Sequence, residues 1–436
     1  MIIRRGMRSR RNGLLALSPL LVMVVLFIVL SLYLHGFHKI PLLIVFLATC
    51  SYALLTLRGL SFEERLAEFS RGAGDSNLLL MVWIFILAGA FASTAKAMGA
   101  VDATVNLTLQ LVPGNMLLAG IFLAACFISL SIGTSVGTIV ALVPIATGLS
   151  LRTGIELPLL VAVVVGGSFF GDNLSFISDT TVVATRTQGC RMSDKFRMNI
   201  RIALPAAFIT LLIYVVMGWG SQTMVPATLQ PNFWKVLPYV VVLVTAVMGM
   251  NVLWVLLLGI ALCGLTGICT GSYDFEGFMN AIVSGVVGMS ELILISMMAG
   301  GLLSVIRRGG GITWIIRTLT RRVKNGRHAE LSIALLVSLT NLCTANNTVA
   351  ILSVGYLARD IAQKFGVDAR KAASILDTFS CCVQGLIPYG AQLLMAGGLA
   401  LITPTSIIPY LFYPMLLGVC ALAAIVLGLP RMQKGS

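Results

Sequence analysis

The sequence predicts an all-α membrane protein made of two related halves, each with five membrane-crossing helices, a re-entrant hairpin and a broken helix. The 436 residues are 58% hydrophobic and 11% charged, a composition that a soluble protein of this size would not have. The apolar segments reach the roughly 20 residues needed to cross a bilayer, and their order repeats in the second half of the chain. Because five crossings is an odd number, the second half is predicted to be inserted upside down.

The first half comprises residues 1–219 and begins with a basic stretch, Met1–Arg11. The apolar segment after it, Leu14 to Leu34, is longer than the apolar core of a cleaved signal peptide, so we expect a retained helix. Polar residues interrupt two later segments, at a hairpin tip (133–138) and in a broken helix (166–181). The apolar segments of this half fall near 14–35, 40–57, 76–100, 115–150, 157–186 and 199–219.

The second half comprises residues 233–436 and follows a predicted external linker at 220–232. Its predicted hairpin tip is at 344–348 and its predicted broken helix is at 381–392, in the same order as in the first half. The apolar segments of this half fall near 233–249, 250–270, 278–305, 328–363, 369–400 and 404–428.

Short sequence matches between the halves indicate an internal duplication. Thr138-Ile139-Val140-Ala141 recurs as Thr348-Val349-Ala350-Ile351, and Phe62-Glu63 recurs as Phe275-Glu276. An amphipathic segment, predicted to lie at the membrane interface, occupies the same place in each half, at Val101–Leu111 and at Ile312–Val323. Each match is weak alone, but together they predict a repeat.

The lysines and arginines predict the topology. With a cytoplasmic N-terminus, ten crossings and two re-entrant hairpins, nearly all of the 30 basic residues lie on the cytoplasmic side. The exceptions are Lys39, Lys96, Arg152 and Lys235. The positive-inside rule therefore predicts a multi-pass protein of the cell (inner) membrane with both termini in the cytoplasm. The net charge of +14 is accounted for by these loops, so we expect no nucleic-acid partner.

The first broken helix carries glycines, hydroxyls and two carboxylates, Asp172 and Asp179, within a segment of membrane length. A charged side chain at the bilayer centre costs about 3 kcal/mol on insertion scales, and unpaired backbone groups add to that cost. Such a segment persists when it is buried in protein or faces a hydrated cavity, and it is typical of the cation sites of secondary transporters. The alternative is a loop outside the membrane.

The four interruptions are predicted to converge near the midplane of the membrane. Serine, threonine and asparagine side chains, with freed backbone carbonyls, supply the hard oxygen ligands that sodium prefers. For each hydroxyl alone the alternative is helix packing. We expect ion or proton binding by Thr134, Ser135, Thr138, Ser175, Ser178 and Thr180, and a second-half contribution from Asn346, Asn347, Thr348, Gln384, Tyr389 and Gln392.

Four acids lie well inside predicted spans: Asp172, Asp179, Glu291 and Asp377. A carboxylate removed from water holds a proton more readily, and a carboxylate that also binds sodium exchanges one for the other. We expect sodium at Asp172, Ser175 and Asp179, with Asp377 as their partner from the second half. Alternatively, Asp377 lies at a cytoplasmic helix end and Glu291 is the structural partner of a neighbouring helix.

Several function classes are disfavoured. The histidines, His35, His38 and His328, fall in predicted loops, and the chain has no HExxH motif, phosphate loop or nucleophile elbow. This argues against a membrane metalloprotease and an ATP-driven pump. The nine cysteines lack metal-ligand spacing and are interpreted as small buried hydrophobes. We expect no enzyme activity and no resident cofactor, with sodium and protons as the transported or coupling ions.

The motifs also carry a family resemblance. The first tip reads Gly133-Thr134-Ser135-x-Gly137-Thr138, and the broken helix reads Gly171-Asp172-x-Leu174-Ser175-x-x-Ser178-Asp179-Thr180-Thr181. Leu376-Asp377, followed by Leu386-Ile387-Pro388-Tyr389, completes the pattern. Together these motifs resemble the NhaC family of sodium/proton antiporters over most of the chain, which implies sodium/proton exchange. The chain departs from the family at Val136 (usually Trp), at Phe176 (usually Pro) and in the Asn346-Asn347 pair.

A more distant resemblance concerns the second half. The Asn-Asn-Thr tip and the segment from Gly385 to Gly390 are similar to those of the ion transporter superfamily, which includes sodium-coupled dicarboxylate carriers. This resemblance implies a scaffold and a moving transport domain, often in a homodimer, working by an elevator motion.

We therefore expect a cation/proton antiporter. The main alternative is a sodium- or proton-coupled carrier of a small organic acid or amino acid on the same fold, because the family also resembles malate/lactate exchangers. The side chains of Asn346, Asn347, Gln384 and Gln392 could recognise the carboxylate or amide groups of such a solute. A channel or a membrane-embedded enzyme is a further alternative.

Overall fold

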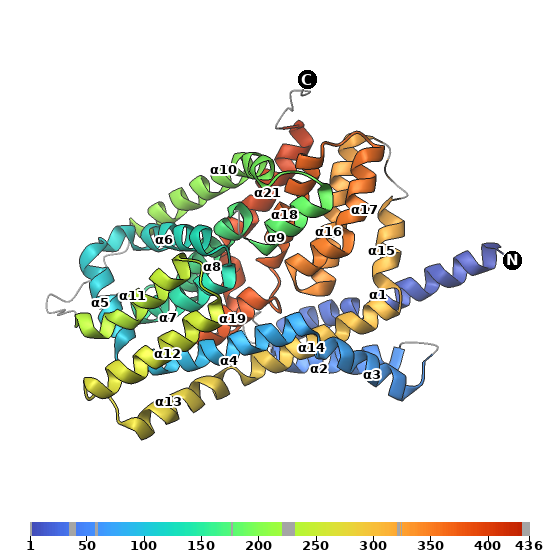
Figure 1. Ribbon diagram of the computed structural model, residues 1–436. Helices are drawn as coiled ribbons and strands as arrows, with labels where there is room; N and C mark the ends of the chain where they lie inside the picture. Colours follow the sequence, from blue (N-terminus) through green and yellow to red (C-terminus); the bar gives the residue numbers. More distant parts are fainter. Residues whose placement is uncertain are drawn as a thin grey trace.

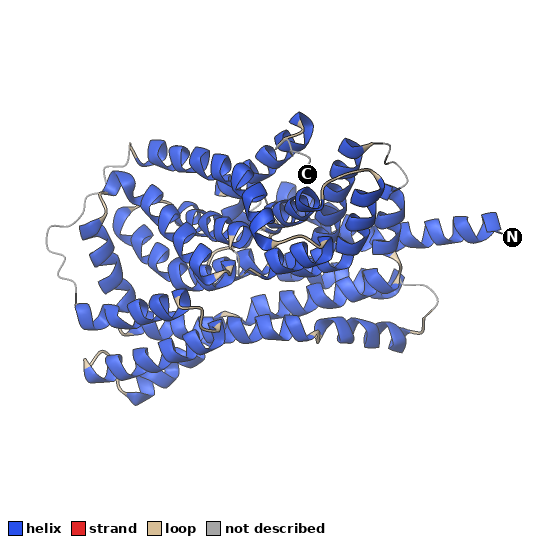
Figure 2. Ribbon diagram, turned by 45° about the horizontal axis from the view of Figure 1, so that its top comes forward, coloured by secondary structure: helices blue, strands red, loops and turns tan. Residues whose placement is uncertain are grey.

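The computed structural model describes residues 2–34, 41–56, 60–175, 178–219, 232–320, 323 and 325–429. Within these ranges the chain forms helices joined by turns, without a strand (Figure 2). Seven of the described helices are long and apolar enough to cross a membrane, or up to eight when the bent pair Ala391–Ala400 and Pro404–Tyr410 counts as one span. The predicted class, an all-α multi-pass membrane protein, is confirmed. The predicted linker at 220–232 lies outside the described residues except for Asn232.

The helices of the first half match the predicted segments, with one addition, α3, which has no predicted counterpart. A capping box between Ser61 and Glu64 starts this amphipathic helix. The elements are α1 (Ile2–Tyr33), α2 (Leu42–Thr56), α3 (Phe62–Ala73), α4 (Ser76–Ala97), α5 (Ala100–Leu111), η2 (Gly114–Met116), α6 (Leu117–Ile132), α7 (Ser135–Thr153), α8 (Leu157–Leu174), α9 (Asp179–Gln188) and α10 (Met192–Gly218).

The second half repeats this order of helices. Its elements are α11 (Phe233–Val247), α12 (Val252–Cys269), α13 (Phe275–Gly288), α14 (Ser290–Arg308), α15 (Gly311–Thr320), α16 (Gly326–Thr344), α17 (Asn347–Lys364), α18 (Ala369–Gln384), α19 (Ala391–Ala400), α20 (Pro404–Ile407), η3 (Ile408–Tyr410) and α21 (Phe412–Leu427).

The packing between the halves is reciprocal. Helix α4 packs against α13, and its counterpart α14 packs against α3. In the same way α9 packs against α17, and its counterpart α19 packs against α7. This pattern is the one expected of two related halves that face each other. Their opposite orientation in the membrane stays a prediction.

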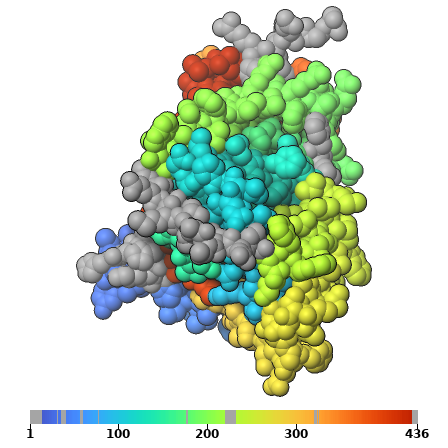
Figure 3. Space-filling model, turned by 90° about the vertical axis from the view of Figure 1, so that its left-hand side faces the viewer, coloured from blue at the N-terminus to red at the C-terminus, as the bar shows by residue number. Residues whose placement is uncertain are grey.

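The helices form two groups (Figure 1). The long helices α4, α13 and α14 run side by side with α2 and α3, below the helices that carry the chain interruptions. Helices α5, α6, α11, α12 and α13 meet at one end of the molecule, where Figure 3 shows them at the surface together with α10. Both helices of the first hairpin, Gly114–Ile132 and Ser135–Thr153, are long enough to cross the membrane themselves. Two helices that each cross the membrane return the chain to its starting side, as a re-entrant hairpin does. The predicted topology of the other helices is the same in both cases.

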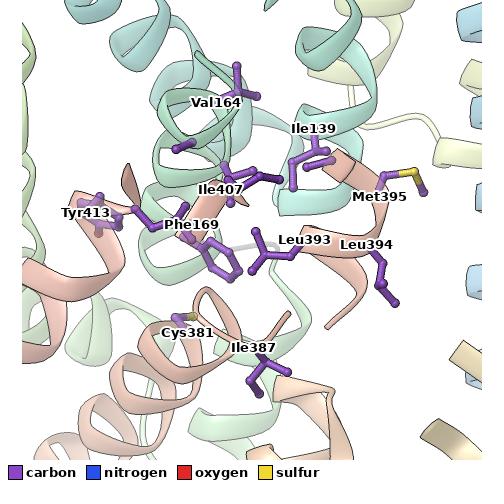
Figure 4. Packing of buried hydrophobic residues seen from close by; sticks show 14 of the residues in the cluster. Ile139, Val164, Phe169, Cys381, Ile387, Leu393, Leu394, Met395, Ile407 and Tyr413 are labelled. Atoms are coloured by element: carbon purple, nitrogen blue, oxygen red, sulfur yellow. The ribbon is translucent and has the colours of Figure 1, made fainter. Parts of the chain in front are cut away.

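Helix α8 lies at the centre of the molecule. Its side chains from Leu160 to Val165 are fully buried, as expected of a helix that is apolar on every face. Farther along α8, Phe169 lies in the same core as Leu393 of α19 and Cys381 of α18 (Figure 4). The burial of α8 places its C-terminal turn, which contains Asp172, deep inside the protein.

Glycines allow the two halves to approach closely. A Cβ atom built on Gly285 of α13 would overlap the backbone carbonyl of Gly89 on α4, and one built on Gly72 of α3 would overlap that of Gly300 on α14. Small residues at helix contacts let backbones pack directly in membrane proteins. The two contacts occupy corresponding places in the two halves. A close glycine contact therefore joins α4 to α13 and α3 to α14 in the same way.

We expect Gly285→Ala to destabilise the protein by about 1–3 kcal/mol, because the added methyl group forces α13 away from α4. Gly288→Ala is the matched control. Gly288 lies on the same helix, and a Cβ atom built there has no neighbouring atom within 4 Å. Thermal unfolding of the purified proteins measures the difference. Equal melting temperatures for the two variants would contradict the close contact.

Candidate cation site

All four chain interruptions meet in one buried hydrogen-bond network. The unwound parts are shorter than predicted, because the helices extend into the predicted segments. The first tip is unwound only at Gly133 and Thr134, and the second only at Ala345 and Asn346. The first broken helix opens after Leu174 and resumes at Asp179, with residues 176–177 outside the described part. The second opens after Gln384 and resumes at Ala391.

Asp172 is the centre of this network. The residue is 6% exposed. It lies in the last turn of α8, whereas the sequence predicted an unwound segment there. Oδ1 accepts a hydrogen bond from Ser178 (2.8 Å), and Oδ2 accepts from Ser135 (3.0 Å) and from Asn347 (3.3 Å). These three residues belong to the starts of α9, α7 and α17, where the helix dipoles favour a negative charge.

The network continues to the second broken helix. Gln392 on α19 donates to the Ser135 hydroxyl (3.0 Å), and its side-chain carbonyl accepts from Gln384 on α18 (2.9 Å). Gln384 also donates to the backbone carbonyl of Ala345 at the second tip (3.0 Å). Thr180 donates to the backbone carbonyl of Asp172 (3.3 Å). Side chains from both halves therefore enclose a single carboxylate.

Other predicted site residues have mainly local partners. Thr138 donates to the backbone carbonyl of Thr134 (3.2 Å), and Asn346 caps α17 by accepting from the Val349 amide (3.0 Å). Tyr389 donates to the carbonyl of Leu342 (2.7 Å). Ser175 is buried beside the network, and Thr348 donates its backbone amide to the Asn347 side chain (3.0 Å).

Asp179 does not join Asp172. It is the first residue of α9, and its side chain is exposed, whereas the next two residues, Thr180 and Thr181, are buried. In the first turn of a helix successive side chains point about 100° apart, so the threonines face the core and Asp179 faces away. The predicted sodium site at Asp172, Ser175 and Asp179 therefore lacks Asp179 in this structure. Glu291, at the start of α14, is also exposed.

A second buried cluster surrounds Asp377 on α18. The Lys195 ammonium lies 2.6 Å from Asp377 Oδ2, and the two side chains are 1% and 0% exposed. Asn173 and Asn199 donate to the same oxygen, at 3.0 and 2.9 Å. Asp377 is thus a core residue rather than a helix-end acid, and its partners were missed in the sequence.

The missed residues have a detectable signal. Lys195 sits among bases such as Arg191 and Arg197, which the positive-inside rule assigns to a predicted cytoplasmic loop. Helix α10 instead starts at Met192, and its buried positions include Lys195, Met198, Asn199, Ile202 and Ala203. These residues recur at helical spacing on one face. A lysine and an asparagine on that apolar stripe mark a buried polar site.

A cavity of about 490 Å³ adjoins the second tip. It lies between α3, α4 and α14 on one side and the tip between α16 and α17 on the other. Its wall includes Glu68, Arg71, Arg307, Thr344, Asn346 and Tyr389. Ala345 also lines the cavity, and its carbonyl accepts the hydrogen bond from Gln384. The cavity therefore adjoins the network around Asp172.

The sequence model of the Na⁺/H⁺ antiporter family matches residues 14–219 and 222–430. The chain belongs to the Na⁺/H⁺ antiporter family. Membership confirms the resemblance carried by the sequence motifs and identifies the chain as a multi-pass membrane transporter.

Relatives match along nearly the whole chain. The malate-2H(+)/Na(+)-lactate antiporter of Bacillus subtilis (strain 168) is 22% identical over 431 residues, 91% of each protein. The Na(+)/H(+) antiporter NhaC of the same strain is 23% identical over 445 residues, 92% of this chain and 94% of the relative. Among solved structures, the YdaH transporter of Alcanivorax borkumensis gives a TM-score of 0.44 at 12% identity, covering 89% of this chain and 99% of that one.

We expect Asp172→Asn to abolish sodium/proton exchange without unfolding the protein, because the amide keeps the size of the side chain but cannot carry the charge. Asp179→Asn is the matched control, and we expect its exchange rate to stay near that of the wild type, because its exposed side chain faces away from the network. Exchange is measured in proteoliposomes with a pH-sensitive dye. An inactive Asp179→Asn protein that folds normally would show that the exposed acid takes part.

Proposed function

We propose that the protein exchanges sodium for protons by holding either ion at Asp172. The observation that carries this proposal is the position of one carboxylate, buried where four helix interruptions meet. Among the described residues Asp172 has hydroxyl and amide neighbours but pairs with no lysine, arginine or histidine. A buried carboxylate without a basic partner is costly unless a cation or a proton neutralises it. Family membership supports sodium and protons as those two ions.

The surrounding groups suit sodium. Carboxylate, hydroxyl and amide oxygens of Asp172, Ser135, Ser178 and Asn347 are hard ligands, and Ser175 is buried nearby. The serine hydroxyls donate to the carboxylate in this structure, but a hydroxyl hydrogen rotates to suit its neighbours and leaves the oxygen available. When sodium binds, the serines turn from donors into ligands, and the proton leaves Asp172.

Competition for one carboxylate couples the two fluxes. The site is neutral when it holds either ion and charged when it is empty, so the empty form has a larger cost of moving through a low-dielectric environment. In this proposal α1–α4 and α11–α14 form the scaffold, and the helices around the site move against it in an elevator motion. The protein acts in the cell (inner) membrane with cytoplasmic termini, as a homodimer.

A second candidate function is the coupled transport of a small organic acid. Two observations favour it: the cavity beside the second tip, whose wall includes Arg71 and Arg307, and the similarity to a malate-2H(+)/Na(+)-lactate antiporter. A volume of about 490 Å³ is within the usual range of small-molecule sites. Arginines make charge-assisted hydrogen bonds to carboxylates. Arg71 makes one to Glu68 in this structure (2.7 Å), and a bound organic acid would replace Glu68 as its partner.

Proton flux in proteoliposomes separates the two functions. We expect sodium alone to drive protons out of acid-loaded vesicles, because Asp172 needs no other solute to exchange its ion. Malate, lactate and a panel of amino acids are added one at a time, and empty liposomes are the control. If flux occurs only when an organic acid is present, the second function replaces the first.

A further inference from the structure

The buried lysine of α10 is held in the manner of a bound cation. The Lys195 ammonium donates to the backbone carbonyl of Asn173 (2.6 Å) and to the Thr181 hydroxyl (2.7 Å), in addition to its contact with Asp377 Oδ2. Its three partners belong to the end of α8, the start of α9 and the middle of α18. They bring one carbonyl, one hydroxyl and one carboxylate around a single positive charge.

The same three oxygens would suit a free monovalent ion. Asn173 is in the last turn of α8, where backbone carbonyls have no partner within the helix and the helix dipole favours a cation. Thr181 belongs to the first turn after the break, and Asp377 supplies the negative charge. The site at Asp172 likewise combines a carboxylate with hydroxyls, although it has a side-chain amide in place of the backbone carbonyl. Around Asp377 the cation is covalently tethered to the chain.

We propose that Lys195 is a tethered cation that permanently fills a second monovalent-cation site, so that Asp172 is the only carboxylate of the two left to exchange an ion. The charges support this assignment: Asp377 is compensated by Lys195, whereas Asp172 has no basic partner among the described residues. The second part of the proposal, one sodium ion exchanged per cycle, rests on the proposed function. The first part, the filled cation site, does not.

A purely structural ion pair is a weaker explanation. Buried ion pairs often add little net stability compared with apolar side chains, so stability alone does not account for a fully buried lysine in a membrane protein. The side-chain amides of Asn173 and Asn199 donate to Asp377 Oδ2, the same oxygen that the ammonium contacts. The other oxygen, Oδ1, has no hydrogen bond among the described residues. The carboxylate is therefore fixed in one orientation toward the ammonium.

Chemical rescue tests the filled site directly. Lys195→Ala removes the tether and opens a space beside the three oxygens, and methylammonium is the probe that replaces the lost ammonium. We expect methylammonium to raise the melting temperature of the purified Lys195→Ala protein, and to restore transport from a loss of at least about tenfold, since removing one partner of a buried pair leaves the other charge uncompensated. Lys195→Ala/Asp377→Asn lacks the anion and should show neither effect.

Arg197→Ala is the control for nonspecific effects of the amine, because Arg197 is exposed on the same helix. The proposal is overturned if methylammonium shifts the melting temperature of Lys195→Ala no more than that of Arg197→Ala, or if Lys195→Ala transports at the wild-type rate without an amine.

Binding of radiolabelled sodium to the wild-type protein provides a test that needs no foldable variant. One ion per chain is expected, and two ions per chain would contradict the tethered cation. If no sodium binds, the proposed function fails, while the rescue experiment still decides whether the second site exists.

Discussion

The structure depends on the cost of burying two carboxylates in the core of the protein. Asp172 and Asp377 lie within the core, where charge is poorly solvated and where neighbouring negative charges repel. The protein meets this cost in two ways. Asp377 has a lysine within the same core, and Asp172 has hydroxyl and amide groups at the starts of three helices. In our proposal the lysine pairing is permanent, whereas the carboxylate of Asp172 binds a mobile ion.

The duplicated architecture explains how so many helix ends reach one place. Each half contributes one hairpin tip and one broken helix, and helices α7 and α17 each pack against the broken helix of the other half. Ser135 and Asn347 therefore approach Asp172 from opposite halves. Close glycine contacts between α3 and α14 and between α4 and α13 keep the remaining helices together beside this core.

The sequence was informative where polar residues interrupt an apolar segment. Glycines, hydroxyls and carboxylates within apolar segments predicted the four interruptions and the residues that meet there, because such groups are expensive in a membrane. The same patterns overestimated the unwound lengths: Asp172 lies in the last turn of α8, and Ser135 begins α7. Hydrogen bonding within a helix extends as far as local geometry allows, and residue type alone does not fix that limit.

The sequence was less informative about which way individual side chains face. Asp179 was predicted beside Asp172, but a single residue's rotation at the start of α9 turns it away. Lys195 was counted as a loop base, although the position of Asn199 one turn later places both on the buried face of α10. These choices depend on where a helix starts and on which neighbours it meets, so they require the tertiary structure.

Proton release on sodium binding tests the central claim most directly. Purified protein in a weakly buffered solution is titrated with sodium chloride while a pH indicator is followed, with choline chloride as the control for ionic strength. If sodium and a proton compete for Asp172, sodium binding releases protons from the wild-type protein and none from Asp172→Asn, and sodium binds more tightly as the pH rises. Sodium binding without proton release at every pH would contradict the account.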